Sequence, residues 1–373
     1  MRMSKQLVIV ESPKKCIKIQ DYIGSSYILR SSKGHLTNIN PKGLNIDIKN
    51  NFTPDYIVVD ADHQNIVNDL KKLIKICDTV YLATDYDREG EGIAWHIYRL
   101  LDLANNPKIK TYRIVFTEIT KKAILEAIKN PKELDYNMVH SQQARQILDK
   151  LLGYKLSSTL HHNFKNYNLS AGRVQSVAVR LIQEREDEIS TFESSKYYKI
   201  DGNFKLSNNS IIHGILDTTF TNEQDARNFI NKCITAKFTI DGIKTSKTKR
   251  RPSPPFTTSS LQQEASVKLG YSPKTTMQLA QKLYENGHIT YMRTDSLAIS
   301  EEALSELKKA IDANYGKEYH HEQRYKTNKK SSQEAHEACR PCDVNVASVN
   351  GTSQENRLYR LIRNRTMACQ MSP

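Results

Sequence analysis

An acidic loop between a buried strand and a helix constrains the fold of this 373-residue chain more than any other stretch. Residues 80–83 form a short apolar run, long enough for one buried strand. Asp85, Asp87 and Glu89 follow it, and after two glycines a helix is predicted over residues 93–101. Because residues two apart project to the same side of an extended backbone, the three carboxylates face one way.

Three carboxylates at the end of one strand repel each other, and a hard cation is needed to keep them all ionised. Ligands in open α/β sheets lie outside the carboxyl ends of the strands, which is where this loop falls. A solvated acidic loop is the alternative interpretation. The buried run before the loop and the glycines after it favour a metal site.

The first third of the chain predicts an α/β domain. Apolar runs that suit strands alternate with segments of helical spacing, so we expect a largely parallel sheet over residues 1–135. The strands are predicted at 7–10, 27–32, 56–59, 80–83 and 112–116, with helices from after residue 15 to about 23 and at 65–76, 93–101 and 121–129.

The remainder predicts a multidomain protein in which helical regions flank a part of a β-rich one. Helices are expected at 137–152, 174–189, 222–233, 259–269, 275–286, 301–314 and from 354, and strands at 197–206, 210–216 and 236–245. The basic, proline-containing stretch 244–255 predicts a linker or hinge. The expected domains are 1–135, 136–192, 193–255, 256–350 and 351–373. The strands after residue 156 lack obvious partners, so we expect the natural chain to continue past its last residue.

The charge balance points to a polyanionic partner. Lys and Arg number 55 against 41 Asp and Glu, giving a net charge of +14. Such an excess suits DNA, RNA or acidic lipid, and charge alone does not choose among them. No apolar run has the length of a membrane span and no secretory leader opens the chain, so an intracellular, soluble protein is expected. Among six cysteines, the pair Cys339 and Cys342 predicts free thiols rather than a zinc site.

A second candidate for chemistry is a tyrosine near an arginine. Tyr291 precedes Arg293 by two residues, so both side chains face the same side of an extended segment. A tyrosine can be a phosphoryl nucleophile when an arginine clamps the phosphate charge. The alternative is a structural tyrosine, because the chain has nineteen of them.

Three further segments suit a nucleic-acid enzyme. Glu11 and Lys15 follow the strand at 7–10, where they could add a fourth carboxylate and a proton donor for a leaving oxygen. The segment 169–178 opens a helix whose free backbone N–H groups suit phosphate, although a tight packing site is the alternative. Arg145 and Asp149, four residues apart on a helix, could equally be a plain ion pair.

These segments resemble the motifs of type IA DNA topoisomerases, in the family's order. VIVESPKK at 8–15 is similar to the family's opening strand, and TDYDREGEGIAWHI at 84–97 to its Toprim acidic motif. ITYMRTDS at 289–296 matches its nucleophile segment. The remaining matches are KGH at 33–35, QQARQILDK at 142–150, LSAGRVQS at 169–176 and EAHEACRP at 334–341. The closest likeness is to bacterial topoisomerase I, which implies a Toprim cleavage domain, arch domains and a nucleophile domain resting on the first.

For the site, the resemblance implies a tyrosine nucleophile. Tyr291 is expected to attack phosphorus and become linked to the 5′ phosphate of a single DNA strand. Arg293 and His336 would stabilise the charge on the phosphorus. Lys15 or Glu11 would protonate the leaving 3′ oxygen.

The resemblance also implies a cofactor and a DNA groove. Mg²⁺ is expected on Asp85 and Asp87, with Glu89 or Glu11 close by. The expected activity is an isomerase reaction: ATP-independent cleavage, strand passage and religation that relaxes negative supercoils, with no ATP motif in the sequence. The DNA-binding residues expected are His35, Arg145, Gln146, Asp149, Lys150, Ser170, Ala171, Gly172, Arg173, Val174, Gln175 and Arg340.

Two other functions stay open from the sequence. One is a Toprim nuclease or primase-like enzyme that uses the carboxylates without a tyrosine. The other is a fragment that binds single-stranded DNA, and cleaves it at most, without full strand passage. A covalent DNA adduct that depends on Tyr291 separates the main interpretation from both.

Overall fold

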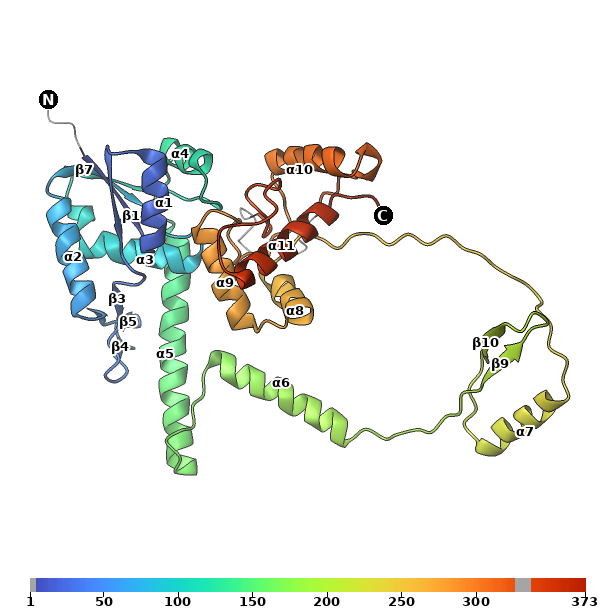
Figure 1. Ribbon diagram of the computed structural model, residues 1–373. Helices are drawn as coiled ribbons and strands as arrows, with labels where there is room; N and C mark the ends of the chain where they lie inside the picture. The colour runs from blue at the N-terminus through green and yellow to red at the C-terminus, as the bar shows by residue number, and fades with distance from the viewer. Residues whose placement is uncertain (1–4, 326–336) are drawn as a thin grey trace. The chain divides into compact units, whose positions relative to one another are not determined.

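The computed structural model describes residues 5–325 and 337–373 (Figure 1). The chain divides into two compact units. The first comprises Met1–Ser170 together with Lys249–Pro373, and the second comprises Ala171–Thr248. Each unit is described by itself.

A parallel sheet of four strands lies at the centre of the described part of the first unit. Its order is β2-β1-β7-β8, and all three pairings are parallel. Strands covered on both faces appear in sequence as continuous apolar runs, as residues 7–10 do here. The expected mixed α/β fold with a parallel sheet is confirmed. The strands are β1 (Lys5–Val10), β2 (Tyr27–Ser31), β7 (Cys77–Leu82) and β8 (Lys110–Arg113).

Helices cover both faces of this sheet (Figure 1). Val8 and Val10 pack in one hydrophobic cluster with residues of α1 and α4. Leu7 and Ile9 face the other way, into a cluster with α2 and α3. The alternation follows from the two-residue period of a strand. The helices are α1 (Pro13–Ile23), α2 (Ala61–Leu73), α3 (Arg88–Leu100) and α4 (Lys121–Lys129), with a short 3-10 turn at Leu103–Asn105.

The apolar run at 56–59 does not join the parallel sheet, so that expectation is wrong. β6 (Tyr56–Val58) pairs antiparallel with β3 (Thr37–Ile39). Beside it, β4 (Ile46–Asp47) pairs with β5 (Thr53–Pro54). We call residues 37–58 the antiparallel lobe. A run of four apolar residues shows that a strand is favoured, but not which sheet it joins.

The long helix α5 (Tyr136–Phe164) leaves the sheet domain. Asp135 caps it by accepting hydrogen bonds from the backbone N–H groups of Asn137 and Met138. The helix continues twelve residues beyond the predicted end at 152. Only Val139 and Gln142, near its start, are buried.

The rest of the first unit is a set of capped helices. Each begins after a Thr or Ser whose hydroxyl accepts a backbone hydrogen bond, which is why the sequence located their starts closely. All but the third of these helices share one hydrophobic cluster with the α1/α4 face of the sheet, and the third packs in a separate cluster with Val344 and Met367. The helices are α8 (Thr258–Leu269), α9 (Pro273–Glu285), α10 (Glu301–Asn314) and α11 (Ser353–Ala368), with a 3-10 turn at Lys317–Tyr319.

The second unit contains α6 (Arg173–Ser190), a hairpin of β9 (Asp201–Lys205) and β10 (Ile211–Ile215), and α7 (Glu223–Ile234). The strand expected at 236–245 is absent, although these residues are all described. In this segment, Phe238 packs against Phe204, with ring centroids 4.8 Å apart. Among the described helices of either unit, none combines the length and apolarity needed to cross a membrane.

Candidate active site

The acidic loop and the tyrosine segment meet in one cleft of the first unit. The cleft has a volume of about 1170 Å³. It lies at the carboxyl ends of β1 and β7, and α9 forms its opposite wall. Seven of the residues predicted from sequence line it: Glu11, His35, Asp85, Asp87, Glu89, Tyr291 and Arg293.

Tyr291 is held by backbone pairing. The N–H of Thr290 donates to the carbonyl of Arg340 at 2.9 Å, and the N–H of Tyr291 donates to the carbonyl of Thr117 at 2.8 Å. The ring of Tyr284 packs edge-on against Tyr291, with centroids 5.1 Å apart. These contacts leave the phenol facing the acidic loop.

The phenol of Tyr291 donates a hydrogen bond to the carboxylate of Asp87. Burial raises the pKa of Tyr291, and the negative charges of Asp85 and Asp87 raise it further, while Arg293 opposes them. The phenol is therefore protonated in this arrangement. To ionise it, the charge of the neighbouring carboxylates has to be offset.

Lys15 connects two of the predicted carboxylates. It is fully buried, and its Nζ donates to Glu11 at 2.7 Å and to Asp85. Burial alone would lower the pKa of Lys15, but the charges of Asp85 and Glu11 outweigh that effect and raise it. Lys15 therefore remains a charged proton donor, buried behind the cleft residues Glu11 and Asp85.

The pKa values of Glu11 and Asp85 are shifted in opposite directions. Burial raises the pKa of Asp85 to about 7, with Lys15 opposing the shift. Burial also acts to raise the pKa of Glu11, but its hydrogen bond with Asp85 and the charge of Lys15 lower it overall. Asp85 is the carboxyl that holds a proton most readily near neutral pH.

The other three predicted residues of the cleft, His35, Glu89 and Arg293, lie toward its mouth. The Oε1 atom of Glu89 is 3.0 Å from Nε2 of His35, and this hydrogen bond is the main cause of the lowered pKa of Glu89. Arg293 is more than half exposed, with Nη1 3.7 Å from Oδ2 of Asp87. Its guanidinium is therefore accessible to a phosphate.

The carboxylates offer only oxygen ligands, which suits a hard divalent cation. Within residues 5–325 and 337–373, however, no three His, Cys, Asp or Glu side chains converge closely enough to hold a metal ion. Each predicted ligand has another partner: Lys15 for Glu11 and Asp85, Tyr291 for Asp87, and His35 for Glu89. Asp85 and Asp87 fit such a cation by their chemistry and by their place in the cleft.

The two glycines after the loop serve packing. A Cβ at Gly90 would lie 2.1 Å from the carbonyl oxygen of Asp85, so only glycine fits there. The hydroxyl of Thr84 donates to the carbonyl of Gly90 at 2.6 Å, and the N–H of Gly90 donates to Asp87 at 2.8 Å. A Cβ at Gly92 would lie 2.8 Å from the side chain of Gln142. The glycines thus allow α3 to approach both the acidic loop and α5.

The predicted DNA-binding face of α5 makes structural contacts as well. Arg145 and Asp149 are 3.9 Å apart and largely exposed. Gln146 donates to Asn38 at 2.9 Å and Lys150 donates to the carbonyl of Pro41 at 3.4 Å, so both reach residues 37–58 or their edge. Arg145 is the residue of this face with the most exposed cation.

The glycine-containing segment falls at the division between the units. Ser170 ends the first unit, and Ala171, Gly172, Arg173, Val174 and Gln175 begin the second. Gly172 is the N-cap of α6 and makes no side-chain cap. The backbone N–H groups of the first turn therefore depend on other partners.

Two further predicted residues, His336 and Arg340, belong to the segment EAHEACRP at 334–341. Arg340 is buried, and its Nη2 donates to Glu118 at 3.2 Å and to Glu337 at 2.5 Å. It therefore has a structural ion-pair role in this arrangement. His336 lies outside the described residues.

The sequence analysis missed Arg113 and Glu91. Both are almost fully buried and form an ion pair, with Nε and Oε2 2.8 Å apart. The available signal was a charged residue inside the apolar run 112–116, because a buried charge requires a partner. Within that run, Arg113 is the only charged side chain.

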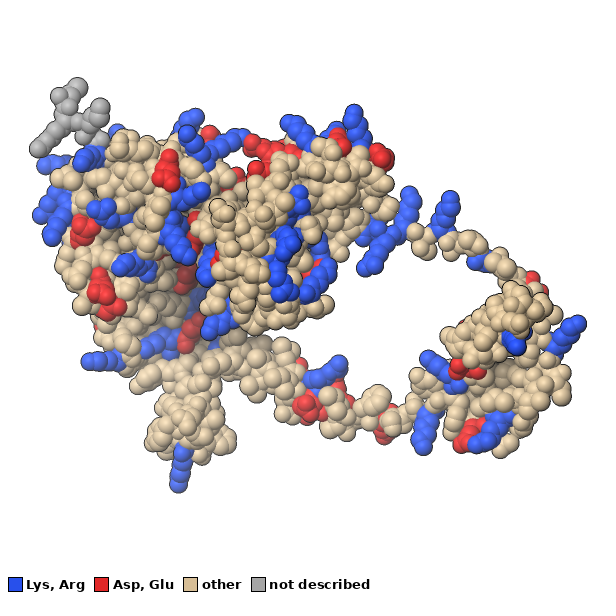
Figure 2. Space-filling model, in the orientation of Figure 1, with Lys and Arg blue, Asp and Glu red and all other residues tan. Residues whose placement is uncertain are grey.

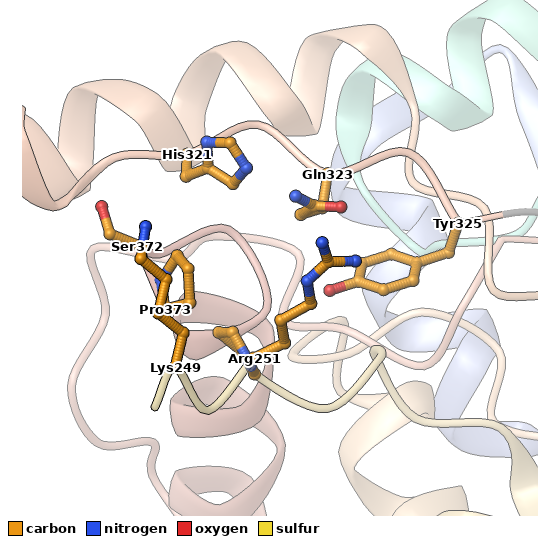
Figure 3. Close-up of a pocket in the computed structure, with 8 residues that line it drawn as sticks. Lys249, Arg251, His321, Gln323, Tyr325, Ser372 and Pro373 are labelled. Atoms are coloured by element: carbon orange, nitrogen blue, oxygen red, sulfur yellow. The ribbon is translucent and has the colours of Figure 1, made fainter. Parts of the chain in front are cut away.

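A second cavity, of about 750 Å³, lies elsewhere in the first unit (Figure 3). Its lining is basic and aromatic and contains none of the predicted site residues. The cavity is lined by Lys249, Arg251, Pro252, His321, Gln323, Tyr325, Ser372 and Pro373.

All six cysteines are free thiols. On the face shown in Figure 2, Lys and Arg are spread among Asp and Glu rather than gathered in one patch.

A parallel sheet with carboxylates at its strand ends defines the class of protein as Toprim-containing, and the Toprim domain model matches residues 6–119. The family model described as DNA topoisomerase matches residues 133–373. The chain therefore belongs to the type IA DNA topoisomerase family, and resembles its topoisomerase I branch.

Similar proteins and a similar solved structure support this family assignment. The chain is 43% identical to DNA topoisomerase 1 of Rickettsia felis, over 98% of this chain and 50% of that protein. It is 42% identical to DNA topoisomerase 1 of Campylobacter jejuni, over 100% of this chain and 55% of that protein. Full-length topoisomerase I from Thermotoga maritima has a similar structure, with a TM-score of 0.82 and 36% identity over 98% of this chain and 61% of that one. The chain spans about half the length of the curated relatives it matches.

Proposed function

We propose that this chain cleaves and rejoins single-stranded DNA by transesterification, as a type IA DNA topoisomerase. The observation that supports this most is the hydrogen bond from the Tyr291 phenol to Asp87, in a cleft that Arg293 also lines, with the buried Lys15 bonded to its lining residues Glu11 and Asp85. A nucleophile, a proton acceptor, a proton donor and a phosphate clamp are thereby within one site.

In the proposed reaction, the phenol oxygen of Tyr291 attacks phosphorus and passes its proton to Asp87. A Tyr–O–P bond forms as the bond from phosphorus to the 3′ oxygen breaks. Lys15 gives a proton from Nζ to the leaving 3′ oxygen. The 5′ phosphotyrosine conserves the energy of the broken bond, so rejoining reverses the same transfers without ATP.

Charge governs this step. Arg293, with its planar donors at the mouth of the cleft, stabilises negative charge on the phosphate oxygens. Asp85 and Asp87 raise the pKa of the Tyr291 phenol and so oppose its ionisation. Asp85 and Asp87 would hold Mg²⁺, which would supply positive charge that offsets both carboxylates.

We further propose that the partner is DNA. The protein is proposed to be intracellular and associated with that DNA. Four lysines line the cleft besides the reacting groups and suit a phosphate backbone. Binding to them should weaken steeply with salt, with a slope of about −0.7 for each phosphate of a single strand. These lysines are Lys14, Lys33, Lys274 and Lys282. Arg145 on α5 and Arg173 and Gln175 at the start of α6 are proposed to extend the contact.

One experiment tests the cleavage chemistry. The protein is incubated with a labelled single-stranded oligonucleotide and Mg²⁺, quenched with detergent and resolved by electrophoresis. A covalent adduct is expected with the native chain and none with Tyr291→Phe. Cleavage products without any adduct would support a Toprim nuclease instead.

Strand passage is a separate part of the proposal. Relaxation of a negatively supercoiled plasmid by the native chain is the expected result. Adduct formation without relaxation would limit the function to cleavage and rejoining.

A further inference from the structure

The guanidinium of Arg113 lies among the backbone carbonyls at and just after the end of β7. Arg113 is the last residue of β8, with 1% of its surface exposed. Its Nη1 donates to the carbonyls of Leu82 at 3.0 Å and Thr84 at 2.9 Å, and its Nη2 to the carbonyl of Asp85 at 2.8 Å. The chain leaving β7 thus turns around one guanidinium, which satisfies carbonyls after the strand has ended.

Glu91 extends this arrangement to another helix. Its Oε2 accepts from Nε of Arg113 at 2.8 Å, and its Oε1 accepts from the backbone N–H of Asp135 at 2.9 Å. Asp135 is the N-cap of α5. The backbone of Arg113 also pairs in both directions with Lys132, at 2.8 and 2.7 Å. One buried ion pair therefore joins the acidic loop to the residues that begin α5.

Stability alone does not account for such a pair. Removing two charges from water costs several kcal/mol per ion, and well-packed apolar residues often replace a buried pair at no loss of stability. What apolar side chains cannot supply is a fixed set of donors, and a guanidinium is planar and rigid. The carbonyls it binds belong to the residues that carry or precede the cleft's carboxylates.

We propose that Arg113 is a positioning residue for the cleavage reaction. It fixes the backbone from which Asp85 and Asp87 reach Lys15 and Tyr291, and through Glu91 it couples that backbone to the start of α5. This inference rests on the proposed function. A misplacement of about 1 Å at such a loop can slow a reaction by about a hundredfold.

The test uses Arg113→Lys, which keeps the charge but loses the fork of donors. Binding of a labelled single-stranded oligonucleotide should stay within about twofold, while the rate of adduct formation falls by about tenfold or more. The matched control is Arg365→Lys, far from the loop in sequence. Arg365 likewise pairs with a carboxylate, Glu264, and donates to a carbonyl, that of Pro254 at 3.2 Å. Its adduct rate should change by less than about twofold.

Hydrogen exchange gives a readout that does not depend on the chemistry. In Arg113→Lys, backbone amides in 83–92 and in 133–140 should exchange about tenfold faster, and in the Arg365→Lys control they should not. Unchanged exchange in both segments overturns the inference. So does faster exchange with an unaltered adduct rate. Should the native chain form no adduct, the proposed function fails, and the exchange result still decides whether Arg113 orders the loop.

A second variant covers the case in which Arg113→Lys does not fold. Glu91→Gln keeps the shape of the side chain and its acceptor oxygen for Asp135, but removes the charge that pairs with Arg113. Faster exchange in 83–92 together with a slower adduct rate is expected. A Glu91→Gln protein with native exchange and a native adduct rate would contradict the coupling.

Discussion

The two halves of the cleft are held differently: in the acidic half (residues 83–91) a buried guanidinium binds the backbone, whereas in the tyrosine half (residues 289–294) backbone pairing and the hydroxyls of Thr258 and Thr290 hold the segment. The guanidinium of Arg113 binds carbonyls of the acidic loop, and Thr84 ties that loop to α3. Around Tyr291, backbone N–H groups pair with the carbonyls of Thr117 and Arg340 instead. Single substitutions should therefore disturb geometry in the acidic half, and in the tyrosine half they should affect mainly the reacting groups.

Polar contacts join the two halves at the cleft. They include the Tyr291–Asp87 hydrogen bond and the ion pair of Arg340 with Glu118. A single hydrogen bond exchanged with water is worth only about 0.5–1.5 kcal/mol net. Because the two halves also share one hydrophobic cluster, these polar contacts are the part of the join that can be broken at small cost.

The largest expected effect isolates the reacting group of the tyrosine half. Tyr291→Phe keeps the ring against Tyr284 and removes only the hydroxyl. Adduct formation should fall by about 10⁴-fold or more, the order seen when a nucleophile is removed. Detergent-quenched electrophoresis measures it. Because the backbone holds this segment, the melting temperature should stay near native, and a large fall in melting temperature would contradict the comparison.

A smaller effect is expected from the proton donor of the acidic half. Lys15→Met should slow adduct formation by about 10²–10⁴-fold, the usual contribution of general acid catalysis. It should also alter the cation concentration that gives half-maximal cleavage, because Glu11 and Asp85 lose their shared partner. Lys14→Met, one residue earlier in the same cleft, should affect only the salt dependence of DNA binding. Equal losses in the two variants would argue against a role for Lys15 in proton transfer.

The join itself is tested by Arg340→Met. Breaking a buried ion pair on one side leaves Glu118 and Glu337 without their cation and should cost about 3–5 kcal/mol of unfolding free energy. Urea denaturation measures the change. The exposed pair of Arg30 and Asp69 is the comparison, because Arg30→Met should cost less than about 1 kcal/mol. A similar small cost at Arg340 would mean that the halves are joined chiefly by apolar packing.

The sequence predicted those parts whose cause is local. Capping hydroxyls and apolar spacing located α4 and α10 to the residue, and the strand-end carboxylates marked the cleft. The sequence did not predict the antiparallel pairing at 37–58, because the strands there are two or three residues long. The strand wrongly expected at 236–245 has suitable residues but no partner strand, and pairing is not a local property.

Site residues divide in the same way. Tyr291 and Asp87 were recognisable because a motif surrounds each of them, although their contact joins positions 204 residues apart. Arg113 carries no motif. Its role depends on four carbonyls and a carboxylate that only the folded chain brings together. Residues that act on backbone atoms leave little trace in sequence, since any residue can supply a carbonyl.

The smallest effect concerns how the acidic half responds to pH. His96 on α3 is buried, and burial, with the positive charges of His35 and Arg99, lowers its pKa to about 3. Its folded pKa thus lies below the unfolded value of about 6.5. The stability it contributes is complete above pH ~6.5 and is lost as the pH falls toward 3.

Between pH 7 and pH 5, the unfolding free energy should therefore fall by about 2 kcal/mol through this residue. Urea denaturation at several pH values measures the fall, and His96→Leu should remove that part of it. His162, an exposed residue of α5, is the control: His162→Leu should leave the pH dependence of unfolding as it is in the native chain. If His96→Leu keeps the full pH dependence, other groups cause it, and the acidic half is no more acid-sensitive than the tyrosine half.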